Sequence, residues 1–227
     1  MKTIKFKKKN VQIFTLYFFL TAGGLWHVLN VLQTTMRILA APLIFGLAVW
    51  VSWDFYQNFS PDQKNQKNRF LAWVISVFVL SYLIELVGVK TGYIFGSNQY
   101  GDTLQPKLFG VPLAIGCALV VMLLSATAIL QKLASKIGKF NLVLQALIIA
   151  LLMVIFDLVM EPAAMKLNYW NWSNGIVPMQ NYLAWFVISF LFILPALKCK
   201  LFEKTSSDIA LHAYVAQFIY FVFIIFK

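Results

Sequence analysis

Charge is scarce in this sequence. Of its 227 residues, 12% are charged and only eight are acidic, whereas about a quarter of the residues in a soluble domain are charged. Hydrophobic residues make up 61% of the chain. This composition excludes an ordinary soluble domain and indicates a polytopic membrane protein.

Cysteine and histidine are also rare, which argues against disulfide, redox and metal chemistry. Cys117 and Cys199 are expected near opposite membrane surfaces, so they cannot form a disulfide or a redox pair. The sequence has no Glu-x-x-His pair, no His cluster and no Cys-x-x-Cys, which argues against a metal site. His27 and His212 are expected at different depths, so they cannot jointly ligate a haem. We predict no metal and no cofactor.

Seven apolar runs are long enough to span a bilayer, since a spanning helix needs about 20 residues. They cover residues 11–32, 38–56, 70–89, 111–131, 141–161, 181–197 and 208–226. We therefore predict an all-α bundle of about seven transmembrane helices. It forms one domain, residues 1–227, with a basic cytoplasmic tail over residues 1–10. The last run has no interior lysine for a retinal Schiff base, which excludes a retinal protein.

Lysine and arginine are distributed unevenly along the chain. With a cytoplasmic amino terminus, the inner segments hold fourteen of them and the outer segments five. Short cytoplasmic loops collect Lys and Arg. This asymmetry predicts a plasma-membrane protein whose amino terminus is cytoplasmic and whose carboxyl terminus is extracytoplasmic. The cations flank helices instead of gathering on one face, which argues against a nucleic-acid partner.

One short pattern occurs twice, each time at the end of an apolar run. A glutamate is followed by lysine at plus five and tyrosine at plus eight: Glu85, Lys90 and Tyr93, then Glu161, Lys166 and Tyr169. Both following loops end in Val-Pro, at 111–112 and 177–178, where proline suits the first turn of a helix. We predict a parallel internal repeat of helices 3–4 and 5–6, with the site between the repeats.

Three acidic residues are expected at one depth near the outer surface. Asp157 and Glu161 are spaced i, i+4 and share a helical face, and Glu85 ends a separate helix. A carboxylate in hydrocarbon costs a few kcal/mol or more, so it is rarely present without a partner or a task. Glu85, Asp157 and Glu161 are therefore the candidate catalytic residues. The alternative is that they form interfacial ion pairs with Lys90 and Lys166.

Aromatic and neutral polar side chains crowd the same outer region. An interfacial aromatic belt explains many of them, but not Trp170-x-Trp172 and Asn181-x-x-x-Trp185 framing one loop. We predict substrate-binding roles for the side chains expected at this level. They are His27, Tyr93, Asn98, Tyr100, Asp102, Trp170, Trp172, Asn181 and Trp185.

A set of short motifs resembles the integral-membrane carotenoid biosynthesis proteins. The motifs are Gly92, Phe95-Gly96, Tyr100, Pro106, Gly110-Val111-Pro112-Leu113, Asp157, Glu161-Pro162, Trp170-x-Trp172, Val177-Pro178, Asn181 and Trp185. That family includes carotenoid 1,2-hydratases acting on lycopene or gamma-carotene and the bisanhydrobacterioruberin hydratases of archaea. The resemblance implies cofactor-independent addition of water to the terminal double bond of an acyclic carotenoid. The implied partners are a carotenoid from the bilayer, membrane lipids and other enzymes of the carotenoid pathway.

The residues suit that chemistry. Protonation of an alkene requires a neutral carboxylic acid, a form that an apolar site favours. Either Glu161 or Glu85 is the general acid, and Asp157 or the other glutamate orients the water. The faces of Trp170, Trp172 or Tyr93 stabilise the cation.

Two other functions remain open at this stage. A carotenoid cyclase would trap the same cation with an internal alkene. A membrane transporter or lipid-binding protein would use the carboxylates to bind an ion or a lipid.

Overall fold

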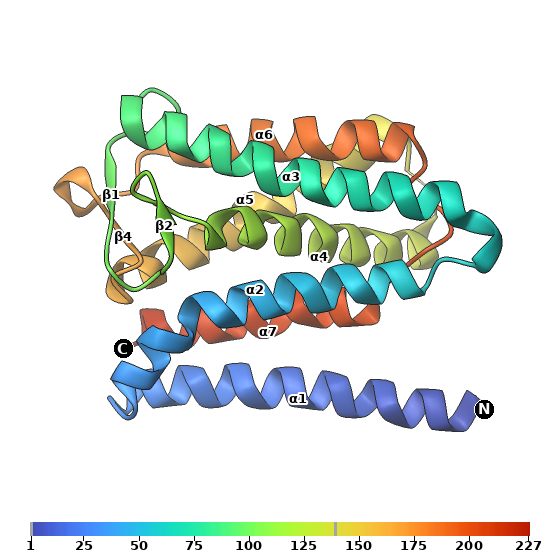
Figure 1. Ribbon diagram of the computed structural model, residues 1–227, viewed down its shortest axis with the longest axis horizontal. Helices are drawn as coiled ribbons and strands as arrows, with labels where there is room; N and C mark the ends of the chain where they lie inside the picture. The colour runs from blue at the N-terminus through green and yellow to red at the C-terminus, as the bar shows by residue number, and fades with distance from the viewer. Residues whose placement is uncertain (1, 139) are drawn as a thin grey trace.

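The computed structural model describes residues 2–138 and 140–227, which form seven long helices (Figure 1). They are α1 (Lys2–Val28), α2 (Gln33–Gln57), α3 (Lys64–Thr91), α4 (Ala114–Ile137), α5 (Leu142–Lys166), α6 (Met179–Lys198) and α7 (Asp208–Ile225). All seven are long and apolar enough to cross a membrane. The predicted all-α membrane bundle is thereby confirmed. Of the predicted inner residues, Met1 and Lys139 lie outside the described part.

The ends of the helices depart from the prediction in two places. Helix α1 ends at Val28 instead of residue 32, because Asn30 and Leu32 adopt positive φ angles and turn the chain into α2. The two Val-Pro pairs precede their helices instead of forming the first turn. Val111–Pro112 is strand β3, and Pro178 is the N-cap of α6. A short 3-10 helix, η1 (Pro61–Gln63), joins α2 to α3.

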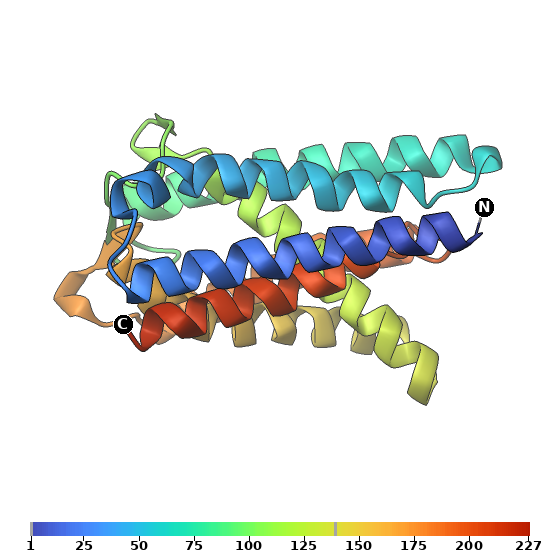
Figure 2. The same ribbon diagram turned by 90° about the horizontal axis from the view of Figure 1, so that it is seen from below.

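Helix α4 is the centre of the bundle. In α4, 78% of the apolar 18-residue stretch is buried, whereas at most 39% of the corresponding stretch is buried in each of the other six helices. It contacts α2, α3, α5 and α7, and it crosses the bundle obliquely (Figure 2). Gly116 allows close approach to α3, since a Cβ there would lie 2.6 Å from the backbone oxygen of Phe78. Small residues at such contacts are typical of membrane helices.

The loops α3–α4 and α5–α6 lie at one end of the bundle, together with the carboxyl terminus (Figure 1). Strand β1 (Asn98–Tyr100) from the first loop pairs antiparallel with β4 (Trp170–Trp172) from the second. We call this two-stranded sheet the lid. Strands β2 (Lys107–Leu108) and β3 form a separate hairpin, and the 3-10 turn η2 (Ser173–Gly175) follows β4.

The register of the lid determines which side chains face the bundle. Asn98 pairs with Trp172 and Tyr100 with Trp170, while Gln99 pairs with Asn171. Opposite residues of an antiparallel pair share one face, and faces alternate along each strand. Gln99 and Asn171 are exposed, so the two tryptophans, Asn98 and Tyr100 lie on the inner face.

The predicted internal repeat stays a prediction. Helices α3 and α4 form one antiparallel pair in contact, and α5 and α6 form another. Their loops meet in the lid. This arrangement is compatible with a repeat, but it does not establish one.

Gly101 is the residue that lets the lid close. Its N–H donates to the backbone oxygen of Tyr169 over 3.0 Å, and a Cβ at Gly101 would overlap the backbone oxygen of Asn168. We expect Gly101→Val to separate β1 from β4, because backbone cannot rotate away as a side chain can. Such overpacking costs about 1–3 kcal/mol. This cost lowers the ratio of paired to separated lid roughly tenfold.

The lid pairing can be measured by a cross-link between its two exposed central residues. Gln99→Cys and Asn171→Cys place two thiols on paired positions, in a background with Cys199→Ser. Disulfide formation on mild oxidation should be roughly tenfold slower when Gly101→Val is added. Gly46→Val is the matched control, since nothing lies within 4 Å of a Cβ there. Equal rates with and without Gly101→Val would refute the close approach.

Candidate active site

A cavity lies beneath the lid, between six of the helices. The empty space among its lining atoms amounts to about 990 Å³, which includes the open solvent at its mouth. Helices α3 to α7 and both lid strands contribute to its wall, and α2 adds Ile44 and Leu47. The polar groups in the wall are Glu85, Asn98, Tyr100, Asp157, Glu161, Tyr169, Trp170, Trp172, Asn181 and Gln217.

Glu161 is held by three N–H donors. The indole Nε1 atoms of Trp170 and Trp172 donate to its Oε2 over 2.8 and 2.7 Å. Asn181 Nδ2 donates to its Oε1 over 3.0 Å. An indole N–H can only donate, so Oε2 of Glu161 accepts from both tryptophans. The lid is thereby bonded to α5 at Glu161.

Asp157 lies one turn below Glu161 and shares a partner with it. Asn181 Nδ2 also donates to Asp157 Oδ2 over 3.0 Å. Both carboxyl groups are buried, with exposures of 5% and 2%. Two carboxylates this close repel each other when both are ionised, and a shared proton relieves the repulsion.

Glu85 faces this pair from α3 and has its own partner in the lid. Tyr100 donates its phenol O–H to Glu85 Oε1 over 2.7 Å. Burial, together with the neighbouring carboxyl group of Glu85, raises the pKa of Tyr100 well above its usual value near 10. The phenol therefore keeps its proton at neutral pH and can hold the glutamate in place.

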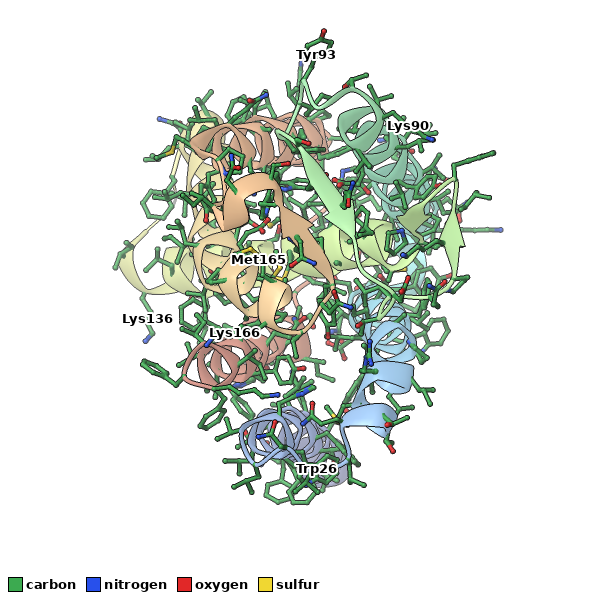
Figure 3. All side chains as sticks on the ribbon, turned by 90° about the vertical axis from the view of Figure 1, so that its left-hand side faces the viewer. Trp26, Lys90, Tyr93, Lys136, Met165 and Lys166 are labelled. Carbon is green, nitrogen blue, oxygen red and sulfur yellow. The ribbon has the colours of Figure 1, made fainter. Side chains whose placement is uncertain are left out.

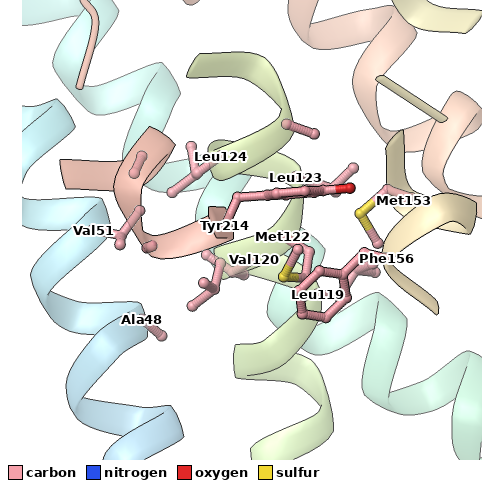
Figure 4. Packing of buried hydrophobic residues seen from close by; sticks show 14 of the residues in the cluster. Ala48, Val51, Leu119, Val120, Met122, Leu123, Leu124, Met153, Phe156 and Tyr214 are labelled. Carbon is pink, nitrogen blue, oxygen red and sulfur yellow. The ribbon is translucent and has the colours of Figure 1, made fainter. Parts of the chain in front are cut away.

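The deeper wall of the cavity is apolar. Figure 4 shows Leu119 and Met122 of α4 beside Met153 and Phe156 of α5. Met160 and Phe221 extend this surface. The cavity thus has a polar end under the lid and a hydrocarbon-like arm inside the bundle. A long apolar molecule with a reactive end matches this polarity.

The structure brings together nine of the twelve predicted site residues. The three carboxylic acids line the cavity, as do Asn98, Tyr100, Trp170, Trp172, Asn181 and Trp185. Trp185 stacks on Phe95 with ring centroids 4.9 Å apart. Their roles in catalysis or binding stay predictions, but their position in one cavity is a structural fact.

Three predicted binding residues do not line the cavity. His27 is buried between Gln33, 3.1 Å from its Nδ1, and the ring of Tyr220, because α1 packs on α7 away from the site. Tyr93 is 85% exposed and projects from the edge of the molecule (Figure 3). Asp102 is exposed on the lid-end surface, with its carboxylate 3.5 Å from Lys107 Nζ.

The two copies of the Glu-Lys-Tyr pattern therefore diverge beyond the glutamate. Lys166 Nζ donates to the backbone oxygen of Ile225 over 2.7 Å, and so ties α5 to the end of α7. Neither Lys90 nor Lys166 forms an ion pair with the carboxylates within the described residues. The alternative of interfacial Glu–Lys pairs is therefore wrong for these residues.

Sequence reasoning missed two polar residues of the cavity wall, Tyr169 and Gln217. Burial raises the pKa of Tyr169 to about 12, so its phenol is neutral. Gln217 Nε2 donates to the Ala213 backbone oxygen over 3.0 Å. Gln217 could have been found in the sequence, because it is a single amide in the middle of the apolar run 208–226. A polar side chain in the membrane interior is costly unless it has a partner.

No group of three or more His, Cys, Asp or Glu side chains in the described residues is arranged to hold a metal ion. The polar end of the cavity instead offers carboxyl groups, N–H donors and aromatic faces. These groups can transfer protons, stabilise a cation and bind water.

Six of the seven helices that are long and apolar enough to span a membrane surround an internal acidic and aromatic cavity, an arrangement that defines the class of multi-pass membrane proteins with a buried cavity. A family model for carotenoid biosynthesis proteins matches residues 38–227. The chain belongs to this family. The match leaves out α1, the helix that lies at the edge of the bundle.

About half of the chain is similar to one curated relative. The bisanhydrobacterioruberin hydratase of Haloarcula japonica is 32% identical over 116 residues. The match covers 49% of this chain and 39% of that protein, so the chain spans about two fifths of its relative's length. The comparison with solved structures found no match.

Proposed function

We propose that this protein is a carotenoid hydratase, which adds water to the terminal double bond of an acyclic carotenoid such as lycopene or gamma-carotene. The observation that carries the proposal is the meeting of Glu85, Asp157 and Glu161 in one cavity with an apolar arm. A hydratase relative and membership of the carotenoid biosynthesis family support it.

The first step is proton transfer to the alkene. Glu85 is the donor, because Tyr100 occupies one of its oxygens and leaves the other to carry the proton. The alkene π pair forms the new C–H bond at the CH carbon, and the neighbouring carbon becomes a tertiary cation. The low polarity of the site favours the neutral acid needed for this step.

The second step is stabilisation and capture of the cation. Glu161 accepts from three N–H groups, which favours its ionised form. Its negative charge and the faces of Trp170 and Trp172 stabilise the cation. A lone pair of water forms the C–O bond, and the released proton passes to the pair of Asp157 and Glu161.

The apolar arm binds the polyene chain behind the reacting end. The carotenoid partitions into lipid, so it enters from the bilayer with its end group toward the lid. Burial of hydrocarbon against Leu119, Met122, Met153 and Phe156 stabilises the complex by about 25 cal/mol per Å² of apolar area. No cofactor takes part in any of these steps.

The test is expression of the chain in a host that accumulates lycopene, followed by mass analysis of the pigments. A hydratase gives a product heavier by one water at each reacted end. An isomeric cyclised product would identify a cyclase instead. Unchanged lycopene, with the protein present in the membrane, would contradict the proposed function.

The lid is proposed to face the extracytoplasmic side of the plasma membrane, as the distribution of lysine and arginine indicates. We expect Tyr93→Cys, exposed at the lid end, to react with a membrane-impermeant thiol reagent in intact cells. Cys199 follows α6 at the opposite end and should react only after the cells are opened. The reverse pattern would invert the orientation.

A further inference from the structure

Asn98 has an unused hydrogen-bond acceptor inside the cavity. Its side-chain oxygen, Oδ1, is buried and has no partner, and the residue is 8% exposed. Three other buried side-chain atoms in the described part of the chain also lack a partner, on Ser125, Gln131 and Ser189. None of those three residues lines the cavity, whereas Asn98 does.

The lid fixes the position of Asn98. Asn98 lies on the inner face of β1, directly opposite Trp172, whose indole donates to Glu161. The amide also lies near the carboxyl group of Glu85. We assign the Nδ2 side of the amide to Glu85 Oε1, the oxygen that accepts from Tyr100 and does not carry the proton, and this assignment leaves Oδ1 to the cavity.

A buried acceptor without a donor is costly, so a ligand should supply one. An acyclic carotenoid end group is a hydrocarbon and has no N–H or O–H to donate. The other reactant of a hydration, water, has two O–H donors. The unmatched oxygen therefore fits the co-substrate and not the carotenoid.

We propose that Asn98 Oδ1 holds the nucleophilic water. This inference rests on the proposed hydratase function and adds the residue that determines the fate of the cation. Water donates one O–H to Asn98 and the other to the carboxyl pair of Asp157 and Glu161. Its free lone pair then faces the tertiary carbon and forms the C–O bond, while one water proton passes to the carboxylate.

Loss of this acceptor should separate protonation from hydration. Without a held water, the cation formed by Glu85 returns a proton and regenerates an alkene. When the reaction is run in D2O, an abortive cycle in which the cation loses a proton other than the newly added deuteron leaves deuterium in the recovered carotenoid. The ratio of hydrate to deuterated carotenoid therefore reports capture of the cation by water, separately from its formation.

The experiment uses membranes that contain the full chain, incubated with lycopene in D2O. Asn98→Leu keeps the size of the side chain and removes the acceptor, and we expect it to lower the ratio of hydrate to deuterated carotenoid about tenfold. Asn98→Asp, which keeps an oxygen at the same position, should retain a higher ratio than Asn98→Leu. Asn171→Leu, on the exposed face of the lid, should match the wild type.

Each outcome decides between the two proposals. If the wild type gives no hydrate, the hydratase function fails and the role of Asn98 falls with it. If the wild type gives hydrate and Asn98→Leu keeps the same ratio, only the inference about Asn98 fails. Loss of both hydrate and deuterium in Asn98→Leu, at normal protein levels, would also overturn it, because Asn98 would then act before the cation forms.

Discussion

Replacement of Glu161 by glutamine is expected to reduce hydrate formation by at least about 100-fold, the usual effect of removing an acid–base group. The amide has no negative charge to stabilise the cation. It also presents an NH2 group where the carboxylate accepted from Trp170, Trp172 and Asn181. At least one buried N–H then has no acceptor, which costs about 1–3 kcal/mol.

Pigment yield, normalised to the amount of protein in the membrane, measures this effect. Glu203→Gln is the matched control, because Glu203 is exposed and pairs with Lys200 in the turn between α6 and α7. That variant should retain wild-type yield. Glu161→Asp keeps the charge and should fall between the wild type and Glu161→Gln. A Glu161→Gln variant with half the wild-type yield or more would contradict the account.

Replacement of Glu85 by glutamine should strongly reduce both hydration and deuterium uptake, because the amide N–H is far too weakly acidic to protonate an alkene. We expect a loss of about 100- to 10,000-fold, the contribution of general acid catalysis. Glutamine keeps the shape and can still accept from Tyr100, so the fold should be unaffected. Deuterium content of the carotenoid recovered from D2O measures the proton-transfer step directly.

Two tyrosines of the α3–α4 loop provide a graded comparison. Tyr100→Phe leaves Glu85 Oε1 without its donor and should lower the rate roughly tenfold. Tyr93→Phe changes an exposed side chain outside the cavity and should have no effect. Deuterium uptake by Glu85→Gln at the wild-type rate would show that another group donates the proton.

The helices and the level of the acids could be predicted from the sequence. Apolar runs of about 20 residues locate spanning helices well. Helical periodicity predicted that Asp157 and Glu161 share one face of their helix. The position of Glu85 at the end of its own apolar run predicted that it lies at the same depth. The cost of buried charge singled out these three residues among the acidic side chains.

The lid could not be predicted, because its strands are three residues each and their paired residues are 70 to 74 positions apart in the chain. Such short segments carry no clear alternation of polar and apolar residues. Without the register, Tyr93 and Tyr100 of the same loop were equivalent candidates. Only the pairing of β1 with β4 places Tyr100 inward, while Tyr93 lies outside the lid and is exposed.

The error at His27 has a similar cause. Sequence periodicity gives the depth of a residue along its helix but not the neighbours of that helix. Helix α1 packs mainly on α7, so a histidine at the right depth is turned toward Tyr220 instead of the cavity. Which helices are adjacent depends on packing between side chains distant in sequence.

The origin of the added oxygen tests the central claim most directly. Membranes containing the wild-type chain would be incubated with lycopene in water enriched in ¹⁸O, without added cofactor, and the product analysed by mass. The account predicts a hydrate whose hydroxyl oxygen comes from water, absent with Glu85→Gln. An oxygen from O2, an isomeric product without oxygen, or undiminished hydrate from Glu85→Gln would contradict it.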